Sequence, residues 1–188
     1  MDELEFRDAT PADAPRLAVV MAEGFDSYRT FAPPGWQPPA VDDFRDAMAK
    51  RLGQPTVWCL LADRGPDVAG YVALLPAADS RRPVPDPQLA HLWMLFVSAA
   101  RWGTGLAAAL HAAACEAAAA RGFTAMRLFT PTEQARARRF YEREGWELTE
   151  GPRDEEDLGL SVVEYRRTLS AADRRSSRTG ERSPRLLR

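Results

Sequence analysis

Short apolar segments alternate with longer amphipathic segments along this chain, and the pattern predicts a mixed α/β fold. A polar stretch at 63–67 separates two strands and predicts a β-hairpin. Antiparallel strands therefore come first, and crossover helices follow. The expected strands are 4–7, 56–62, 68–75, 91–97, 125–129, 146–149 and 161–167, and the expected helices are 11–23, 41–52, 104–121 and one that ends near residue 144.

The most informative segment is a strand, a turn and a helix within residues 90–107. The apolar run 91–97 predicts a strand buried on both faces, and the alanine-rich run after it predicts a helix that stops at Gly122. Gly103 and Gly105 lie where this helix begins. The first turn of a helix attracts anions through unpaired N–H groups, and glycines allow close approach. The turn therefore predicts a phosphate-bearing cofactor; the alternative is glycine used for turn geometry alone.

The spacing Gly103-x-Gly105-x-x-Ala108 also satisfies the dinucleotide-binding pattern of a Rossmann oxidoreductase. In that fold, however, the turn follows its strand directly and further strand-helix units come after it. Here six residues separate Val97 from Thr104, and a single convincing strand-helix pair remains downstream. We therefore reject the dinucleotide interpretation.

Two blocks of sequence resemble the Gcn5-related N-acetyltransferase (GNAT) superfamily, whose signature is Gln/Arg-x-x-Gly-x-Gly/Ala at a helix start. The first block here is 102–107, with Trp102 in place of Gln or Arg. The family's second block is Asn-x-x-Ala-x-x-x-Tyr on a helix, followed by Gly-Phe. In this chain Gln134 replaces the Asn and Trp146 the Phe, while the matching residues are Ala137, Tyr141 and Gly145.

The resemblance covers residues 3–169 and implies one GNAT domain over 1–169. It implies a mostly antiparallel central sheet that splays at the strand before the cofactor helix, with helices on its faces. The implied cosubstrate is acetyl-CoA. By motif position, its binding residues are Leu95, Phe96, Val97, Trp102, Gly103, Thr104, Gly105, Leu106, Ala107 and Gln134.

Tyr141 takes the position of the family's general acid, which faces the departing sulfur. Because a phenol is a weaker acid than a thiol, Tyr141 is expected to stabilise the thiolate by hydrogen bonding. His91 is the candidate base, since a histidine titrates near neutral pH. The strand resembles the arylalkylamine acetyltransferase branch with its His-Leu-His, where His91 matches the first histidine and Trp93 departs from the second. Alternation places His91, Trp93 and Leu95 on one face, unless a bulge interrupts it; the alternative for His91 is a structural residue.

The segment 23–39 mixes aromatic rings, carboxylates and prolines, and in this fold such a segment forms one wall of the acceptor site. Rings and carboxylates suit an organic amine. The alternative is a hydrophobic plug over the sheet. The residues expected to bind the acceptor are Glu23, Tyr28, Trp36 and Trp93.

Composition sets further bounds on the protein. With 188 residues and a net charge of −2, the chain suits one domain, and no signal peptide or membrane span is expected. Cys59 and Cys115 are expected as buried free thiols in a cytoplasmic protein, and neither has an obvious histidine partner nearby in sequence. The spacing of metal ligands is absent from the sequence, so no metal site is expected.

The C-terminal segment 170–188 contains six Arg against two acidic residues and is expected to be a disordered basic tail. The tail lacks interleaved aromatic residues and follows an acidic body, which argues against a nucleic-acid partner. We expect a monomer or a homodimer.

The sequence thus predicts an acetyl-CoA-dependent N-acetyltransferase that acts on a small primary amine by direct attack in a ternary complex. One alternative keeps this chemistry with a protein N-terminus or an aminoacyl-tRNA as the acceptor. Another is a non-catalytic acyl-CoA-binding regulatory module.

Overall fold

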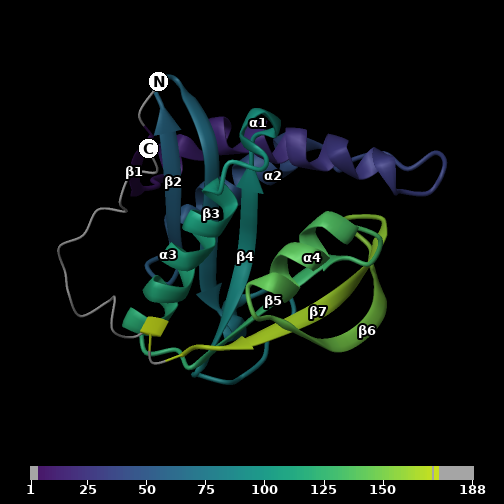
Figure 1. The fold of residues 1–188 in the computed structure, drawn as a ribbon. Helices are drawn as coiled ribbons and strands as arrows, with labels where there is room; N and C mark the ends of the chain where they lie inside the picture. Colours follow the sequence, from purple (N-terminus) through teal and green to yellow (C-terminus); the bar gives the residue numbers. More distant parts are fainter. Residues whose placement is uncertain (1–3, 171, 174–188) are drawn as a thin grey trace.

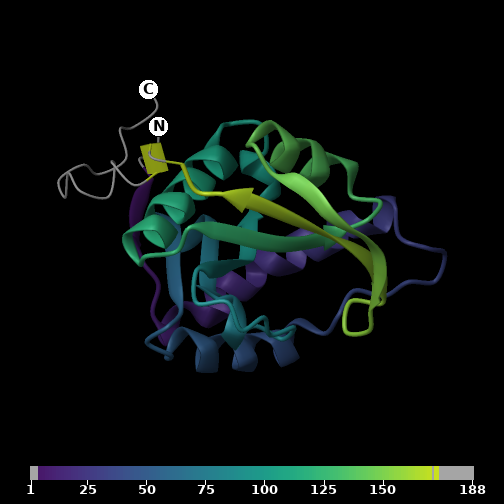
Figure 2. The same cartoon turned by 90° about the horizontal axis from the view of Figure 1, so that it is seen from below.

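The computed structural model describes residues 4–170, 172 and 173, which form a seven-stranded sheet with helices on both faces (Figures 1 and 2). The strand order is β1-β2-β3-β4-β5-β7-β6. Within these residues only β4 and β5 pair in parallel, so the predicted mixed and mostly antiparallel sheet is confirmed. The strands are β1 (Glu5–Asp8), β2 (Trp58–Arg64), β3 (Asp67–Pro76), β4 (Leu89–Val97), β5 (Ala125–Pro131), β6 (Glu147–Glu155) and β7 (Leu160–Thr168).

Four α-helices flank this sheet: α1 (Ala14–Asp26), α2 (Val41–Leu52), α3 (Leu106–Ala120) and α4 (Ala135–Arg143). Each face of the sheet has its own apolar core. The buried alanine and leucine face of α3 packs with β4 and β5 on one side, and α4 adds Tyr141 to the same cluster. On the other side, α1 and α2 cover the sheet through residues such as Met21 and Met48. The separation of helices into two layers is visible in Figure 2.

The beginning of α1 shows how local sequence sets an element. Thr10 precedes a short 3-10 turn, Pro11–Asp13, and its amide donates to the Asp13 carboxylate at 2.8 Å. The Arg7 guanidinium also binds Asp13, at 2.6 Å, and this contact holds the pKa of the carboxyl well below its usual range. The helix expected at 11–23 thus begins with this 3-10 turn, and the α-helix proper begins at Ala14 and continues to Asp26.

Two other expectations are met closely and two are corrected. The helix at 41–52 coincides with α2, and the predicted hairpin is the antiparallel pair β2–β3. The strand predicted at 146–149 is much longer, because it continues as β6 to Glu155 along the edge of the sheet. The strand predicted as buried on both faces is buried over its first half, while residues 95–97 are half-buried because they border a cleft.

The C-terminal segment 170–188 lies outside the described residues except for positions 170, 172 and 173. Among the described residues, no helix is long and apolar enough to cross a membrane.

Candidate active site

Strands β4 and β5 start as neighbours and then separate (Figure 1). They pair only over Leu89–His91 and Ala125–Arg127, whereas β4 pairs with β3 along nearly its whole length. The edge of β4 beyond His91 therefore turns toward an open space instead of toward a strand. This is the splay that the sequence predicted before the cofactor helix.

A β-bulge at Trp93 changes which side chains share a face of β4. The register with β3 shifts between Ala73 and Leu74: Ala73 pairs with Met94 and Leu74 pairs with Leu92. Trp93 therefore has no partner residue on β3. Trp93 packs with the α1–α2 core, while Leu95 packs with the α3 core. His91, Trp93 and Leu95 were expected to share one face unless a bulge interrupted the strand, and the bulge places Leu95 on the other face.

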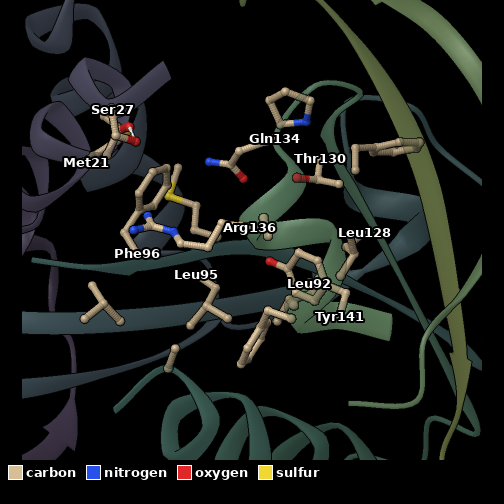
Figure 3. Close-up of a pocket in the computed structure, with 18 of the residues that line it drawn as sticks. Met21, Ser27, Leu92, Leu95, Phe96, Leu128, Thr130, Gln134, Arg136 and Tyr141 are labelled. Carbon is tan, nitrogen blue, oxygen red and sulfur yellow. Dashed lines mark hydrogen bonds between the residues drawn. The ribbon is translucent and has the colours of Figure 1, made fainter. Parts of the chain in front are cut away.

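A cleft with a volume of about 710 Å³ follows this separation of the strands (Figure 3). Figure 3 shows side chains from α1, such as Met21, and Ser27 just after it, facing side chains from β5 and α4 across the cleft. The structure thus gathers residues that are far apart in the sequence around one cavity. The predicted site residues that line it are Tyr28, His91, Trp93, Leu95, Phe96, Val97, Trp102, Gly103, Gly105, Ala107, Gln134 and Tyr141.

The structure places four predicted site residues outside the lining of this cleft. Leu106 is buried in the core under α3, and Thr104 donates from its hydroxyl to the Arg101 carbonyl at 2.8 Å. The Glu23 carboxylate accepts the Ala99 N–H at 3.1 Å, so it is engaged with the backbone. The Trp36 indole N–H donates to the Leu158 carbonyl at 2.8 Å and packs over the β6–β7 turn.

The turn between β4 and α3 has the geometry expected of an anion site. Gly103 and Gly105 have φ angles of 78° and 88°, a left-handed conformation that side-chain-bearing residues rarely adopt. Within the described residues, no backbone carbonyl accepts the N–H groups of Gly105, Leu106 or Ala107. Free N–H groups at the positive end of the helix dipole favour a bound phosphate.

Sequence reasoning missed most of the positive charge around this turn. Besides Arg101, which immediately precedes Trp102, three arginines of α4 line the cleft: Arg136, Arg139 and Arg143. A signal was present in the basic run at 136–139, but only the fold shows that α4 faces the glycine turn.

Tyr141 lies in the wall of the cleft on α4 and is 9% exposed. Burial raises the pKa of its hydroxyl, and the neighbouring Tyr28 raises it further. Burial also raises the pKa of Tyr28 to about 12, against the opposing effects of Arg136 and the Gln134 side chain. Both phenols therefore remain protonated near neutral pH and are available as hydrogen-bond donors.

His91 lines the cleft but is only 8% exposed, and its Nδ1 has no hydrogen-bond partner among the described residues. Burial lowers the pKa of His91 to about 3, and the positive charges of Arg127 and Arg51 act in the same direction. The imidazole is therefore neutral near neutral pH. This environment opposes the proton-accepting role predicted for His91.

The loop between β3 and β4 contacts the turn between β6 and β7 where both line the cleft. The Arg82 guanidinium forms an ion pair with Glu155 at 2.9 Å and donates to the Asp154 carbonyl at 3.1 Å. Arg81 pairs with Asp157 in the same turn. These contacts join the β3–β4 loop to the β6–β7 turn, and the four side chains of the ion pairs line the cavity.

Neither cysteine provides a nucleophile at this site. Both are buried free thiols, as predicted, and neither lines the cleft. The expectation that Cys115 lacks a histidine partner is wrong, because its Sγ lies 3.5 Å from Nε2 of His111, one helical turn away on α3. Burial nevertheless raises the pKa of the Cys115 thiol to about 12, so it remains protonated. His111 is a packing residue, as expected, and accepts the Trp146 indole N–H at 2.8 Å.

No group of His, Cys, Asp or Glu side chains suited to hold a metal ion is found in the part of the chain that the structure describes. The polar groups that the cleft does offer are backbone amides, arginines and phenols. Together, the fold and the cleft define an α/β protein with a site for an elongated ligand that bears phosphate at one end.

Comparison with known proteins identifies the class further. Residues 21–146 match the model of the acetyltransferase (GNAT) family, so the chain belongs to this family. No match is found among curated proteins.

Solved structures share the fold at low sequence identity. An acetyltransferase from Thermus thermophilus is 23% identical, with a TM-score of 0.64, and the match covers 89% of this chain and 97% of that one. The PaiA N-acetyltransferase from Thermoplasma acidophilum, in complex with coenzyme A, is 14% identical with a TM-score of 0.66, covering 86% and 97%. YncA from Salmonella typhimurium, with its cofactor acetyl-CoA, is 16% identical with a TM-score of 0.66, covering 89% and 94%.

Proposed function

We propose that this member of the acetyltransferase family transfers an acetyl group from acetyl-CoA to the primary amine of a small molecule, by direct attack in a ternary complex. The observation that carries the proposal is the separation of β4 from β5 in front of the glycine turn, with Tyr141 in the wall of the resulting cleft. The similar structures of PaiA and YncA, which hold coenzyme A and acetyl-CoA, support the choice of cosubstrate.

The residues of the cleft fit this cosubstrate. The free amides at Gly105 and Leu106 suit a diphosphate, and the half-buried edge at Leu95–Val97 offers backbone groups to an extended arm. Acetyl-CoA supplies an acetyl thioester, whose carbonyl carbon accepts the amine. In our proposal the backbone N–H groups of this edge bind the carbonyl oxygen as negative charge develops on it.

Tyr141 acts on the leaving group in this scheme. The amine nitrogen forms a bond to the carbonyl carbon, the carbon–sulfur bond breaks, and the sulfur leaves as a thiolate. Because burial raises the pKa of Tyr141, its neutral hydroxyl donates a hydrogen bond to that sulfur and keeps its own proton. The attacking nitrogen becomes positively charged as its bond to the carbonyl carbon forms, and it then gives its proton to the departing thiolate, which leaves a neutral amide and the thiol of coenzyme A.

His91 has a different role here from the one that the sequence predicted. With a pKa of about 3, its neutral ring is too weak a base to hold the proton of an amine. We propose that it contacts the acceptor as a neutral polar group. The amine therefore has to lose its ammonium proton to solvent before it attacks.

The joined loops beside the cleft support a small acceptor over a macromolecule. The ion pairs Arg82–Glu155 and Arg81–Asp157 join two loops that line the cavity. A folded protein or a transfer RNA would need these loops to separate. The cytoplasmic location, the monomeric or homodimeric state and the absence of a nucleic-acid partner stay predictions.

The test is a panel of primary amines assayed for release of the CoA thiol, with product mass as a second readout. The panel contains aliphatic amines, aromatic amines, polyamines and amino acids, and a peptide with a free N-terminus is included for comparison. We expect thiol release and a mass gain of one acetyl group with at least one class of small amine. Coenzyme A binding without turnover of any amine would support a non-catalytic module, and turnover of the peptide alone would contradict the small acceptor.

A further inference from the structure

The glycine turn lacks the Gln or Arg side chain that the family signature places at its start. Trp102 occupies that position, is 40% exposed, and lines the cleft immediately before Gly103. An indole cannot bind a phosphate as a charged donor does. A diphosphate at this turn would therefore depend on the backbone amides and on cations near the turn, of which Arg101 immediately precedes Trp102 and a second comes from elsewhere in the fold.

Arg136 brings a cation to this position from another element. Its guanidinium carbon lies 3.5 Å from the centre of the Trp102 ring, although the two residues belong to α4 and to the β4–α3 turn. Figure 3 shows the Arg136 side chain extending from the α4 side across the cleft toward Phe96. Arginine stacks well on the face of an indole, because the planar cation is attracted by the negative ring face.

The Trp102 ring is itself held in place. Its indole N–H donates to the Val97 carbonyl at 2.9 Å, which ties the ring to the end of β4. This bond leaves the ring face free for Arg136. The tryptophan thus provides a fixed surface on which a flexible arginine is oriented.

The donors of Arg136 are not used by the protein itself. Within the described residues, no carboxylate pairs with this guanidinium and no group accepts a hydrogen bond from it. Its other interaction is electrostatic, with Tyr28 on the opposite wall. Arg81 and Arg82, which line the same cleft, are by contrast paired with carboxylates. Arg136 is therefore a cation with free N–H groups next to the free amides of the turn.

We propose that Arg136, oriented by the Trp102 indole, binds the diphosphate of coenzyme A in this protein and takes the place of the Gln or Arg side chain that the family signature has at position 102. The inference rests on the proposed function, because it assumes that the cleft binds coenzyme A. In the ligand-bound state, the guanidinium and the amides of Gly105 and Leu106 contact the same diphosphate.

The test measures binding of three probes by calorimetry: coenzyme A, dephospho-coenzyme A, which lacks only the 3′-phosphate, and pantetheine, which lacks the diphosphate and the whole adenosine 3′-phosphate. We expect Arg136→Gln to weaken both nucleotide-bearing probes equally, by about tenfold, the scale of one charged hydrogen bond. Pantetheine affinity should not change. The control is Arg121→Gln, which removes an arginine stacked on Trp58 at 5.5 Å, away from the cleft, and should leave all three affinities unchanged.

Variants of Trp102 test the orienting surface. Trp102→Phe keeps an aromatic face and should retain most of the affinity, whereas Trp102→Ala should weaken coenzyme A binding. Adding Arg136→Gln to Trp102→Ala should cost less than it does in the parent, because the two side chains act together. Thermal unfolding of every variant confirms that it is folded.

Three results would overturn the inference. The first is equal coenzyme A affinity in Arg136→Gln and the parent. The second is a loss of affinity for coenzyme A but not for dephospho-coenzyme A, which would assign Arg136 to the 3′-phosphate, and the third is an equal loss of affinity for pantetheine. If the parent protein binds no coenzyme A at all, the proposed function itself fails. The two failures are thus distinguishable.

Discussion

The Glu23 carboxylate accepts a hydrogen bond from the Ala99 amide at 3.1 Å, and this bond ties the end of α1 to the turn that follows β4. The acid that the sequence assigned to the amine acceptor thus supports the cofactor turn. Because the contact is exposed, we expect Glu23→Ala to lower the free energy of unfolding by no more than about 1 kcal/mol. Coenzyme A binding should also weaken, because the turn loses a support.

Chemical denaturation and calorimetry check this prediction, with Asp26→Ala as the control. Asp26 lies near the same end of α1, but its side chain is exposed and pairs with Arg29 on the surface. The control should change neither quantity. A raised KM for the amine in Glu23→Ala, with stability and coenzyme A affinity intact, would return Glu23 to the acceptor site.

Replacing Tyr141 with Phe removes the hydroxyl and keeps the buried ring. We expect kcat to fall by about 10- to 100-fold, since one hydrogen bond to the leaving sulfur is lost. Coenzyme A affinity should remain within about twofold of the parent in the same calorimetric assay. The matched control is Tyr71→Phe, a buried tyrosine that does not line the cleft and whose hydroxyl contacts the sulfur of Met94 at 3.6 Å. An unchanged kcat in Tyr141→Phe would remove Tyr141 from the mechanism.

The two histidines make stability depend on pH. Burial lowers the pKa of His91 to about 3 and that of His111 to about 4, while both titrate near 6.5 in the unfolded chain. Between about pH 6.5 and 4 the unfolded state therefore binds protons that the folded state does not, and stability falls as the pH decreases. Each histidine contributes a slope of at most about 1.4 kcal/mol per pH unit.

Urea denaturation from about pH 7.5 to 4.5 measures this slope. His91→Gln cannot titrate, so its slope should be smaller than that of the parent by the contribution of one histidine. The same variant tests the catalytic role. If His91 is not the base, the acidic limb of the pH profile of kcat/KM follows the pKa of the chosen amine and is the same in His91→Gln. A limb that stays at one pH for amines of different pKa, and vanishes in the variant, would restore the role predicted from the sequence.

Gly24 allows α1 to approach β4 closely. A Cβ at this position would come too near to the Phe96 ring, in contact with its Cδ1 atom. We therefore expect Gly24→Ala to destabilise the protein by about 1–3 kcal/mol and to lower kcat/KM, because Phe96 belongs to the strand that lines the cleft. Phe96→Leu in the Gly24→Ala background should recover part of the stability.

The control for replacing a glycine by alanine is Gly53→Ala, because at Gly53 the closest atom to an added Cβ is 3.5 Å away. Equal stability losses at both positions would show that the Phe96 contact is not the cause.

Local signals in the sequence predicted much of the fold. The run 41–52 has the same bounds as α2, and Thr10 and Pro11 mark the beginning of the first helical region. The glycine turn and Tyr141 were found because short motifs determine them. A bulge in this strand was allowed for, but its position at Trp93 depends on the register with β3, and so the face of Leu95 could not be predicted.

The predicted site residues also differ in whether a local motif or the tertiary structure determines their position. Gln134 and Tyr141 line the cleft as expected, since a motif places them on one helix and its cap, which the fold carries to the cavity. Glu23 and Trp36 were assigned to the acceptor from the composition of their segment and its place in the fold, and in the structure both bind backbone groups of distant segments. The proton-accepting role of His91 rested on a motif resemblance and on the ordinary pKa of histidine, which burial changes.

The sequence by itself determined the family, the strand-turn-helix that prepares an anion site, and the position of Tyr141, because each depends on residues close together in the chain. The tertiary structure decided where β4 and β5 separate, which charges face the cleft, and that Arg136 lies on Trp102. The physical reason is that burial, strand register and contacts across the cleft arise only when distant segments pack together. Their effects on pKa and on available hydrogen-bond donors therefore cannot be obtained from local sequence.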